Sequence, residues 1–311
     1  MIKVGVVGAT GLVGKVMMHL LEKLEKNIEI QAFASRSDQR EISGIPVKKL
    51  DSVPDNLDFA LFSAGSSVSK QWCPEFAQND IICIDNSSAF RQQPEIPLVV
   101  PEINFQDISN EHRIISNPNC STIPVVRVLN YFIESIEGFN AVTFQSVSGA
   151  GRSGIQSLIR ERSGQKAENS PFEIGVFNNV IPKIGDVLKD GATAEEKKMV
   201  EEARKILHRE DLKITSTCVR VPVEIGHSIA LTVDSRNITP AQIRKKLEEA
   251  EDIVLCDIPN PLDIAGTDNI SVGRIRTEWG NPQKISLFIC ADNLRIGAAT
   301  NAVRILKKML D

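Results

Sequence analysis

The first fourteen residues constrain the fold of this 311-residue chain more than any other segment. Ile2–Val7 is a short run of apolar and β-branched residues, which is typical of a buried strand. It leads into Gly8–Gly14, a turn whose glycines have the spacing GxxGxxG. Apolar residues then recur at steps of three and four, as in a helix: Val13, Val16, Leu20 and Leu24. Such glycines let the backbone approach a pyrophosphate at the helix N-terminus, so the segment predicts a dinucleotide-binding fold.

The second predicted strand, at 28–34, ends where a contact to the ribose of the cofactor is expected. An acidic residue there would bind the 2′-hydroxyl of NAD, but the chain has Ser35 and Arg36 at this point. Arginine suits the 2′-phosphate of NADP, so the pattern favours NADP. Two alternatives stay open: Asp38 would support NAD, and Arg36 would be one solvated charge among several.

Composition and charge exclude several classes of function. Hydrophobic residues make up 42% of the chain, enough for two domain cores. The net charge is −4 with both signs interspersed, so we expect neither nucleic acid nor a membrane surface as a partner. No apolar stretch approaches a membrane span, and the N-terminus lacks a signal-peptide pattern. The six cysteines are scattered without a CxxC pair, which predicts free thiols in the cytoplasm and neither disulfides nor a metal site.

The strand pattern of the first part of the chain predicts a nucleotide-binding domain. Up to about residue 119, short strands alternate with helical or loop segments. The strands are expected near 2–7, 28–34, 57–63, 81–85 and 98–100. This alternation predicts an α/β fold whose N-terminal part is a Rossmann-type, doubly wound parallel sheet.

Beyond Cys120 the strands become longer, as in an α+β domain. We expect strands at 141–148, 213–223, 228–233 and 284–290, and helices at 193–208 and 239–250. After Asp292 a final helix carries one apolar stripe, which needs a partner and is expected on the N-terminal domain. The expected division is therefore 1–119 with 292–311 as the NADP-binding domain and 120–291 as the catalytic domain.

A cysteine in a polar turn is the strongest candidate for chemistry. Cys120 lies in Ser116–Thr122, immediately before an apolar run that reads as a helix with Pro124 in its first turn. A thiol at a helix N-terminus faces unpaired N–H groups and the positive end of the dipole, which favour the nucleophilic thiolate. The alternative is a small buried apolar cysteine. The polar residues on both sides favour the reactive thiol.

A nucleotide domain and a thiol together suggest covalent oxidation of an aldehyde. The thiolate would add to the aldehyde, and the thiohemiacetal would give hydride to the nicotinamide. Water, phosphate or coenzyme A would then attack the resulting thioester. Such chemistry needs a base, and the chain has only four histidines. His227 lies between two predicted strands beside a glycine, whereas the other three are expected at surface or capping positions.

Five motifs in order resemble aspartate-semialdehyde dehydrogenases over nearly the full length. The motifs are Gly8–Gly14, Asn117–Thr122, Gln145–Gly151, Thr217–His227 and Ala291–Ala299. The resemblance implies NADP-dependent reduction of L-4-aspartyl phosphate to L-aspartate 4-semialdehyde, in the biosynthesis of lysine, threonine, methionine and isoleucine. The reverse reaction is phosphorylating oxidation of the aldehyde. It also implies a cytoplasmic homodimer, in some members a tetramer, formed through the catalytic domain.

The resemblance also implies roles for individual residues. Cys120 is the nucleophile, His227 the general acid/base, and Gln145 positions the acyl intermediate. Arg220 binds the substrate carboxylate, a bidentate task for which lysine is poorly suited. Glu195 contacts the substrate amine.

Two further groups of residues follow from the resemblance. The phosphate-binding group is Arg91, Lys198 and Asn119, and the cofactor-binding group is Gly8, Thr10, Gly11, Leu12, Val13, Ser35, Arg36, Ser148, Gly149 and Asn293. The three-residue step between Glu195 and Lys198 puts both on one helical face. An alternative reading remains there, because Thr193 and Glu196 form a capping-box pattern and Lys197 is a competing charge.

Two alternative functions are weighed against this expectation. N-acetyl-γ-glutamyl-phosphate reductase uses a similar thioester, but its nucleophile usually follows glycine, whereas Asn119 precedes Cys120. A catalytically inactive relative that only binds nucleotide or a partner chain would have lost the thiol or the base. Here Cys120, Gln145, Arg220 and His227 are all present.

Overall fold

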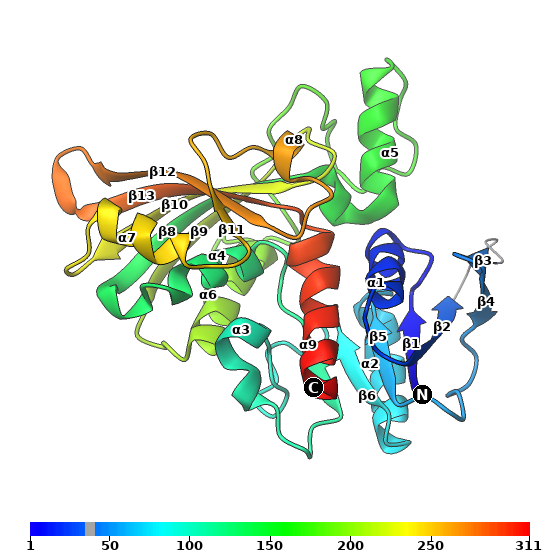
Figure 1. Cartoon of the computed structure of the whole chain (residues 1–311). Helices are drawn as coiled ribbons and strands as arrows, with labels where there is room; N and C mark the ends of the chain where they lie inside the picture. The colour runs from blue at the N-terminus through cyan, green and yellow to red at the C-terminus, as the bar shows by residue number, and fades with distance from the viewer. Residues whose placement is uncertain (35–40) are drawn as a thin grey trace. The chain divides into compact units, whose positions relative to one another are not determined.

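The chain forms two compact units and crosses between them twice. The computed structural model describes residues 1–34 and 41–311 (Figure 1). The first unit comprises Met1–Asn119 and Ala298–Asp311, and the second comprises Cys120–Gly297.

The sequence predicts the second crossing at Asp292. The structure places it a few residues later, after Gly297. Asp292 accepts a hydrogen bond from the N–H of Gly266, and Asn293 accepts one from the N–H of Gly226. Both residues are thereby tied to the second unit. The chain leaves that unit within the π-helical turn η4 (Arg295–Ala299).

The first unit is built on a seven-stranded sheet in the order β3-β4-β2-β1-β5-β6-β7. The strands are β1 (Ile2–Val7), β2 (Ile28–Ala34), β3 (Glu41–Ile42), β4 (Ile45–Lys49), β5 (Phe59–Phe62), β6 (Ile82–Asp85) and β7 (Ile114–Ser116). All pairs are parallel except β3 with β4. The chain builds one half of the sheet outward from β1 and then returns to build the other half. The predicted doubly wound parallel sheet is confirmed.

One predicted strand, at 98–100, is wrong. Leu98 makes a single parallel bridge to Ser116, and β7 takes the edge position instead. The chain turns because Pro101 begins a short helix, α3 (Pro101–Asn104). The side chain of Asn104 stabilises this turn by accepting from the N–H of Val100 and donating to the carbonyl of Leu98.

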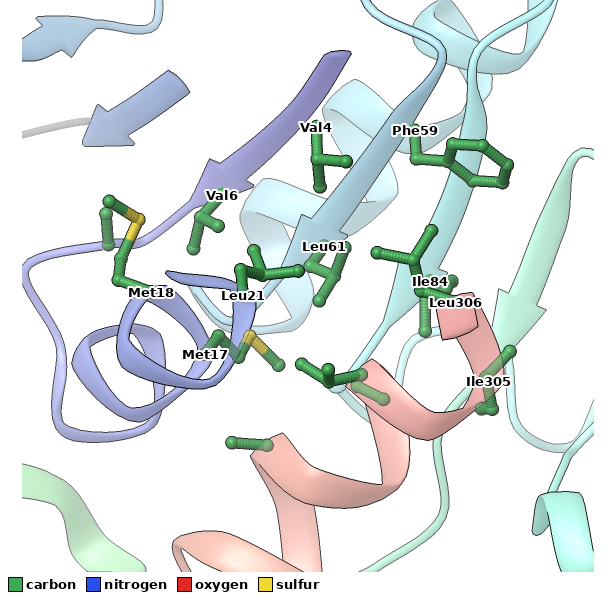
Figure 2. Packing of buried hydrophobic residues seen from close by; sticks show 14 of the residues in the cluster. Val4, Val6, Met17, Met18, Leu21, Phe59, Leu61, Ile84, Ile305 and Leu306 are labelled. Atoms are coloured by element: carbon green, nitrogen blue, oxygen red, sulfur yellow. The ribbon is translucent and has the colours of Figure 1, made fainter. Parts of the chain in front are cut away.

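Alternation along the strands sends apolar side chains to both faces of this sheet. Val4, Leu61 and Ile84 point to one face and pack with α1 (Leu12–Glu22) and α9 (Thr300–Leu310), as Figure 2 shows. The other face carries a second core with Phe62 and Phe76, the latter from α2 (Ser66–Gln78). The apolar stripe of α9 thus completes the core of the first unit.

The second unit is built on a six-stranded mixed sheet in the order β11-β12-β13-β10-β8-β9. The strands are β8 (Ile136–Gln145), β9 (Lys213–Arg220), β10 (His227–Ser235), β11 (Ile253–Leu255), β12 (Ile270–Glu278) and β13 (Asn281–Ala291). The β8–β9 and β11–β12 pairs are parallel, and the other pairs are antiparallel. The four predicted strands are present, whereas β11 and β12 were not predicted.

The helices of the second unit differ in whether a side chain caps their N-terminus. They are α4 (Thr122–Asn130), α5 (Gly151–Arg162), α6 (Ala194–Leu207), α7 (Pro240–Glu248) and α8 (Pro261–Ile264). Thr193 and Thr239 each cap a helix in a full capping box, at the N-termini of α6 and α7. Helix α6 packs on β9, and α4 packs on α6 and β13.

Short turns of other types join these elements. They are the 3₁₀ helices η1 (Phe105–Asp107), η2 (Ile133–Ser135) and η3 (Val147–Ala150). Within residues 1–34 and 41–311, no helix has both the length and the apolar character that crossing a membrane requires.

The last glycine of the N-terminal turn should be intolerant of any side chain. A Cβ atom at Gly14 would lie 2.8 Å from Ala9 Cα and still closer to the carbonyl oxygen of Gly8. We therefore expect Gly14→Ala to lower the free energy of unfolding by about 1–3 kcal/mol, the usual cost of overpacking. Urea denaturation measures this. The control is His19→Ala, an exposed site on the same helix, with an expected change within about 0.5 kcal/mol. Equal midpoints for the two variants would contradict the tight contact.

Candidate active site

Three adjacent strands of the second unit place polar residues where the strands begin or end, along one edge of the sheet. Gln145 ends β8 and is the register partner of Arg220, which ends the parallel strand β9. His227 begins β10, which runs antiparallel to β8, and it pairs with Ala291 at the end of β13. The strand order β13-β10-β8-β9 therefore brings three predicted site residues together.

Cys120 faces this edge from the loop before α4. Ser121 is the N-cap residue of that helix, whose first turn contains Pro124. The Cys120 Sγ atom lies 3.3 Å from Nε2 of His227. Gly297 packs directly against the cysteine, since a Cβ atom there would lie 2.9 Å from the Cys120 carbonyl oxygen. The terminal motif thus needs glycine at this position.

His227 is fully buried and its second ring nitrogen is also bonded. The main-chain N–H of Ser146 donates to Nδ1 at 3.1 Å, and the Ser146 hydroxyl oxygen is also 3.1 Å from Nδ1. Burial lowers the pKa of His227 to about 3, with a further lowering from the Arg220 guanidinium. The imidazole is therefore neutral at physiological pH.

Arg220 is a buried cation with a carbonyl as its hydrogen-bond acceptor. Its exposed fraction is 6%, and Nη1 donates to the carbonyl oxygen of Ser146 at 2.6 Å. Across the described part of the chain it forms no ion pair. Burial lowers the pKa of Arg220 from its ordinary value. A buried guanidinium of this kind would be neutralised by an anionic ligand.

A cavity of about 480 Å³ opens beside Arg220. Phe172 forms part of its wall, and its ring centroid is 5.8 Å from the guanidinium carbon. Lys183 and Ile184 also line the cavity, whereas Cys120 does not. The volume is within the range of small-molecule sites.

Gln145 connects the thiol segment to helix α6. Its side-chain amide donates to the hydroxyl of Ser121 at 3.2 Å and to the carboxylate of Glu195 at 3.3 Å. The other Glu195 oxygen accepts from Lys198 Nζ at 2.9 Å. The three-residue step does place Glu195 and Lys198 on one face, and Glu196 makes the capping box with Thr193. The capping box thus uses Glu196 and leaves Glu195 to pair with Lys198, and the ligand-binding roles of Glu195 and Lys198 remain predictions.

Ser148 and Asn293 lie in a buried network behind His227. The Asn293 amide donates from Nδ2 to the Ser148 hydroxyl at 3.0 Å. The Ser148 hydroxyl is 3.0 Å from that of Ser146. Gly149 packs against the imidazole, since a Cβ atom there would lie 3.5 Å from Nε2. Ser146 was not singled out from the sequence. Its main-chain N–H and its hydroxyl both contact the histidine, and the pairing of β8 with β10 brings the two residues together.

The remaining predicted site residues belong to the first unit. Gly8, Thr10, Gly11, Leu12 and Val13 form the turn from β1 into α1 and the first residues of that helix. Gly8 has φ of 88°, and a Cβ atom would lie 2.8 Å from the main chain of Ser63. This close backbone approach fits the cradle that a pyrophosphate needs. Ser35 and Arg36, the predicted ribose contacts, lie outside the described residues.

Two predicted phosphate ligands, Arg91 and Asn119, are also in the first unit and are buried. Arg91 donates to the carbonyl of Asn86 at 2.9 Å. Its charge also lowers the pKa of Asp85, against a larger raising effect of burial. Among residues 1–34 and 41–311, no cluster of three or more histidine, cysteine or acidic side chains could hold a metal ion.

Family comparisons agree with the two-unit division of the chain. A family described as "Semialdehyde dehydrogenase, NAD binding domain" matches residues 3–111. A family described as "Semialdehyde dehydrogenase, dimerisation domain" matches residues 129–296. Fold and site thus define a dehydrogenase with a nucleotide-binding domain and a dimerisation domain, in which the second unit carries a thiol–imidazole pair.

Relatives with similar sequences identify the family within this class of dehydrogenases. The aspartate-semialdehyde dehydrogenase of Aquifex aeolicus is 38% identical, with 99% of this chain and 98% of the relative covered. That of Streptomyces akiyoshiensis is 40% identical, with 97% of each covered. The crystal structure of aspartate semialdehyde dehydrogenase II complexed with ASA from Vibrio cholerae has a TM-score of 0.95 and 37% identity, covering 100% and 98% of the two chains. This chain belongs to the aspartate-semialdehyde dehydrogenase family of oxidoreductases, which confirms the resemblance.

Cys120 should react first with an alkylating reagent. Cys120 and Cys256 are partly exposed, whereas the other four cysteines are buried. Burial raises the pKa of Cys218 and of Cys290 to about 11, which makes both slow to react. Within residues 1–34 and 41–311, Cys120 is the cysteine that lies beside an imidazole and near a guanidinium, which favours the thiolate.

Iodoacetamide labelling followed by peptide mass mapping over time measures this order. We expect His227→Asn to slow the labelling of Cys120 and to leave that of Cys256 unchanged. Labelling of Cys256 before Cys120 in the unaltered protein would contradict an activated thiol.

Proposed function

We propose that this chain catalyses the NADP-dependent reduction of L-4-aspartyl phosphate to L-aspartate 4-semialdehyde and phosphate, and the reverse phosphorylating oxidation. The observation that carries the proposal is the 3.3 Å contact between Cys120 Sγ and His227 Nε2, beside Gln145 and Arg220. These residue types at one strand edge suit a thioester route. Relatives that align over nearly the whole chain are named for the same reaction.

Cys120 carries the acyl group in this proposal. Its thiolate attacks the acyl carbon, the C–O bond to phosphate breaks, and a thioester forms on Sγ. A bound NADPH would supply hydride to the thioester carbon. The C–S bond then breaks, which releases the aldehyde and restores the thiolate. His227, within hydrogen-bond distance of Sγ, is proposed as the general acid/base, and Gln145 is proposed to orient the acyl group.

Arg220 and Glu195 are proposed to recognise the two charged groups of the amino-acid substrate. The buried guanidinium forms no ion pair within the described residues, so a substrate α-carboxylate would neutralise it. The Glu195 carboxylate is also buried and would accept from the substrate amine. In the structure its partners include Gln145 and Lys198, and the amine would join them.

Phosphate, cofactor and assembly complete the proposal. Lys198, Arg91 and Asn119 are proposed to bind the phosphate; Lys198 extends from α6, and Arg91 and Asn119 are buried. Gly8–Val13, Ser148, Gly149 and Asn293 are proposed to bind NADP, with Ser35 and Arg36 at the 2′-phosphate.

The dimerisation-domain match supports a homodimer, from which some family members form tetramers. Six free cysteines support a cytoplasmic location, since thiols stay reduced there. The biosynthesis of lysine, threonine, methionine and isoleucine is the corresponding pathway role.

A spectrophotometric assay that follows NADPH directly tests the reaction. We expect NADPH to form from NADP and L-aspartate 4-semialdehyde only when phosphate is present. Cys120→Ala should lower turnover by several orders of magnitude, because covalent catalysis has no substitute for the thiol. Cys256→Ala is the control and should keep activity. Faster turnover of N-acetyl-glutamate semialdehyde would identify the chain as an N-acetyl-γ-glutamyl-phosphate reductase. Activity in Cys120→Ala would exclude a thioester intermediate on Cys120.

Arg220→Lys should separate substrate binding from chemistry. Lysine keeps the charge but loses the two parallel hydrogen bonds to a carboxylate, so the KM for aldehyde should rise about tenfold or more. Because the clamp acts on substrate and transition state alike, kcat should change less. Arg276→Lys, an exposed arginine of β12, is the control. Steady-state kinetics measure the aldehyde KM and kcat of both variants. An unchanged aldehyde KM in Arg220→Lys would exclude Arg220 as the residue that binds the substrate carboxylate.

A further inference from the structure

The loop that carries Arg91 begins at a buried carboxylate. Asp85 is the last residue of β6 and is fully buried, and residues 86–91 follow it. A carboxylate removed from water must be satisfied by hydrogen-bond donors, because burial of an unpaired charge is costly. The partners of Asp85 therefore show which segments this residue holds in place.

Three donors from two segments surround the Asp85 carboxylate. Oδ1 accepts from the Ser69 hydroxyl of α2 at 2.7 Å and from the main-chain N–H of Ser87 at 3.0 Å. Oδ2 accepts from the Ser87 hydroxyl at 2.7 Å. Because the N–H of Ala89 donates to Ser87 Oγ at 3.1 Å, the proton of that hydroxyl is left for Asp85. Each contact suits an ionised carboxylate, which only accepts hydrogen bonds.

Burial and the surrounding groups act on the pKa of Asp85 in opposite senses. Burial raises this pKa, and the hydrogen bonds from Ser69 and Ser87, followed by the charge of Arg91, lower it. Arg91 is itself buried. Asp85 and Arg91 are thus linked by opposite charge as well as by the short loop between them.

The hydrogen bonds of the loop also orient Arg91. The N–H of Asn86 donates to the carbonyl of Phe62 at 2.9 Å, and Arg91 Nη2 donates to the carbonyl of Asn86 at 2.9 Å. Asn86 lies between Asp85 and Ser87, whose side chains are bonded to each other. The carbonyl that receives the guanidinium is therefore fixed by the contacts of Asp85.

A second segment with a proposed phosphate ligand meets the loop at the same place. Asp85 is the register partner of Ser116 at the end of β7, and its carbonyl accepts from the N–H of Asn117 at 2.8 Å. Asn117 Nδ2 donates to Asn86 Oδ1 at 2.5 Å. Asn119 follows two residues later. The loop and this segment therefore start from one hydrogen-bonded corner of the first unit.

We infer that Asp85 is a positioning residue, which acts through Ser87 and the Asn86 carbonyl to hold Arg91 in place for phosphate. This inference rests on the proposed function and adds a residue that supports a phosphate ligand without taking part in the chemistry. With the loop fixed, Arg91 binds phosphate without first having to be ordered, so less binding energy is lost. Removal of the carboxylate should keep the guanidinium charge but loosen its position.

A purely structural role makes a different prediction. Through Ser69, Asp85 also ties β6 to α2, and the hydroxyls of Ser66 and Ser88 add a second contact of 3.1 Å between α2 and the loop. If Asp85 only stabilised the fold, its replacement would lower the free energy of unfolding and leave the KM for phosphate unchanged. The KM for phosphate and the stability must therefore be measured separately.

Asp85→Asn tests the inference. It removes the charge and replaces one acceptor oxygen by an NH2 group, so a donor loses its partner. We expect the KM for phosphate to rise about fivefold or more, because the loss of a hydrogen bond to a charged group is felt in part at Arg91. The aldehyde KM and kcat should change by less than about twofold. Steady-state kinetics in the oxidative direction measure these constants, and urea denaturation measures stability.

Two further variants complete the comparison. Asp58→Asn is the matched control: Asp58 accepts from the main-chain N–H of Lys3 at 2.7 Å and precedes β5, at the opposite end of the strand pair β5–β6 from Asp85. It should leave all three kinetic constants unchanged. Ser87→Ala keeps the Asp85 charge and removes only the hydroxyl bond. It should raise the phosphate KM in the same direction, and it decides the inference should Asp85→Asn fail to fold.

A double-mutant cycle with Arg91→Leu tests whether the effect passes through Arg91. In Arg91→Leu, adding Asp85→Asn or Ser87→Ala should change the phosphate KM by less than about twofold. The same fold-change with and without Arg91 would overturn the inference, as would an unchanged phosphate KM in both single variants. Failure of the proposed function would appear differently, as no phosphate-dependent formation of NADPH by the unaltered protein, and the inference would fall with it.

Discussion

Parallel pairing of β8 with β9 is the constraint on which the site depends. The register places Gln145 opposite Arg220, and the neighbouring strands β10 and β13 bring His227 and Asn293 to the same edge. Successive side chains of a strand point to opposite faces, so a slip of one residue would turn these groups away from one another. Helix α6 covers β9 and presents Glu195 to Gln145. Catalytic geometry is thus a property of strand register.

Burial sets the electrostatics of this edge. Removing Arg220 from water leaves a cation whose acceptor is a carbonyl, and an anionic ligand would neutralise this buried charge. The same burial keeps His227 neutral, because a second positive charge beside the guanidinium would be costly. One cation and one neutral imidazole therefore lie near Cys120. The arrangement costs the fold some stability, since buried polar groups must all find partners.

How much could be predicted from the sequence differs between the secondary-structure elements and the candidate active site. Periodicity and glycine spacing predicted β1, the turn and α1, because local sterics decide them. The strand at 98–100 was wrong, because the Asn104 side chain bonds the preceding backbone and turns the chain. Strands β3, β4, β7, β11 and β12 were missed. The motifs placed Cys120, Gln145, Arg220 and His227 on a candidate list, and the resemblance to a family was confirmed. The individual roles remain predictions.

By itself the sequence determined the class of fold, the family and the residue types available for catalysis, since each is encoded in patterns of a few neighbouring residues. It did not determine which groups meet. The 107-residue separation of Cys120 and His227 is closed only by the packing of α4 and the pairing of β10 with β8. The contact of Ser146 with His227 is made in part by a main-chain N–H, and every residue except proline has that group. Only the tertiary structure could place this contact, because the direction of that N–H is set by where β8 ends.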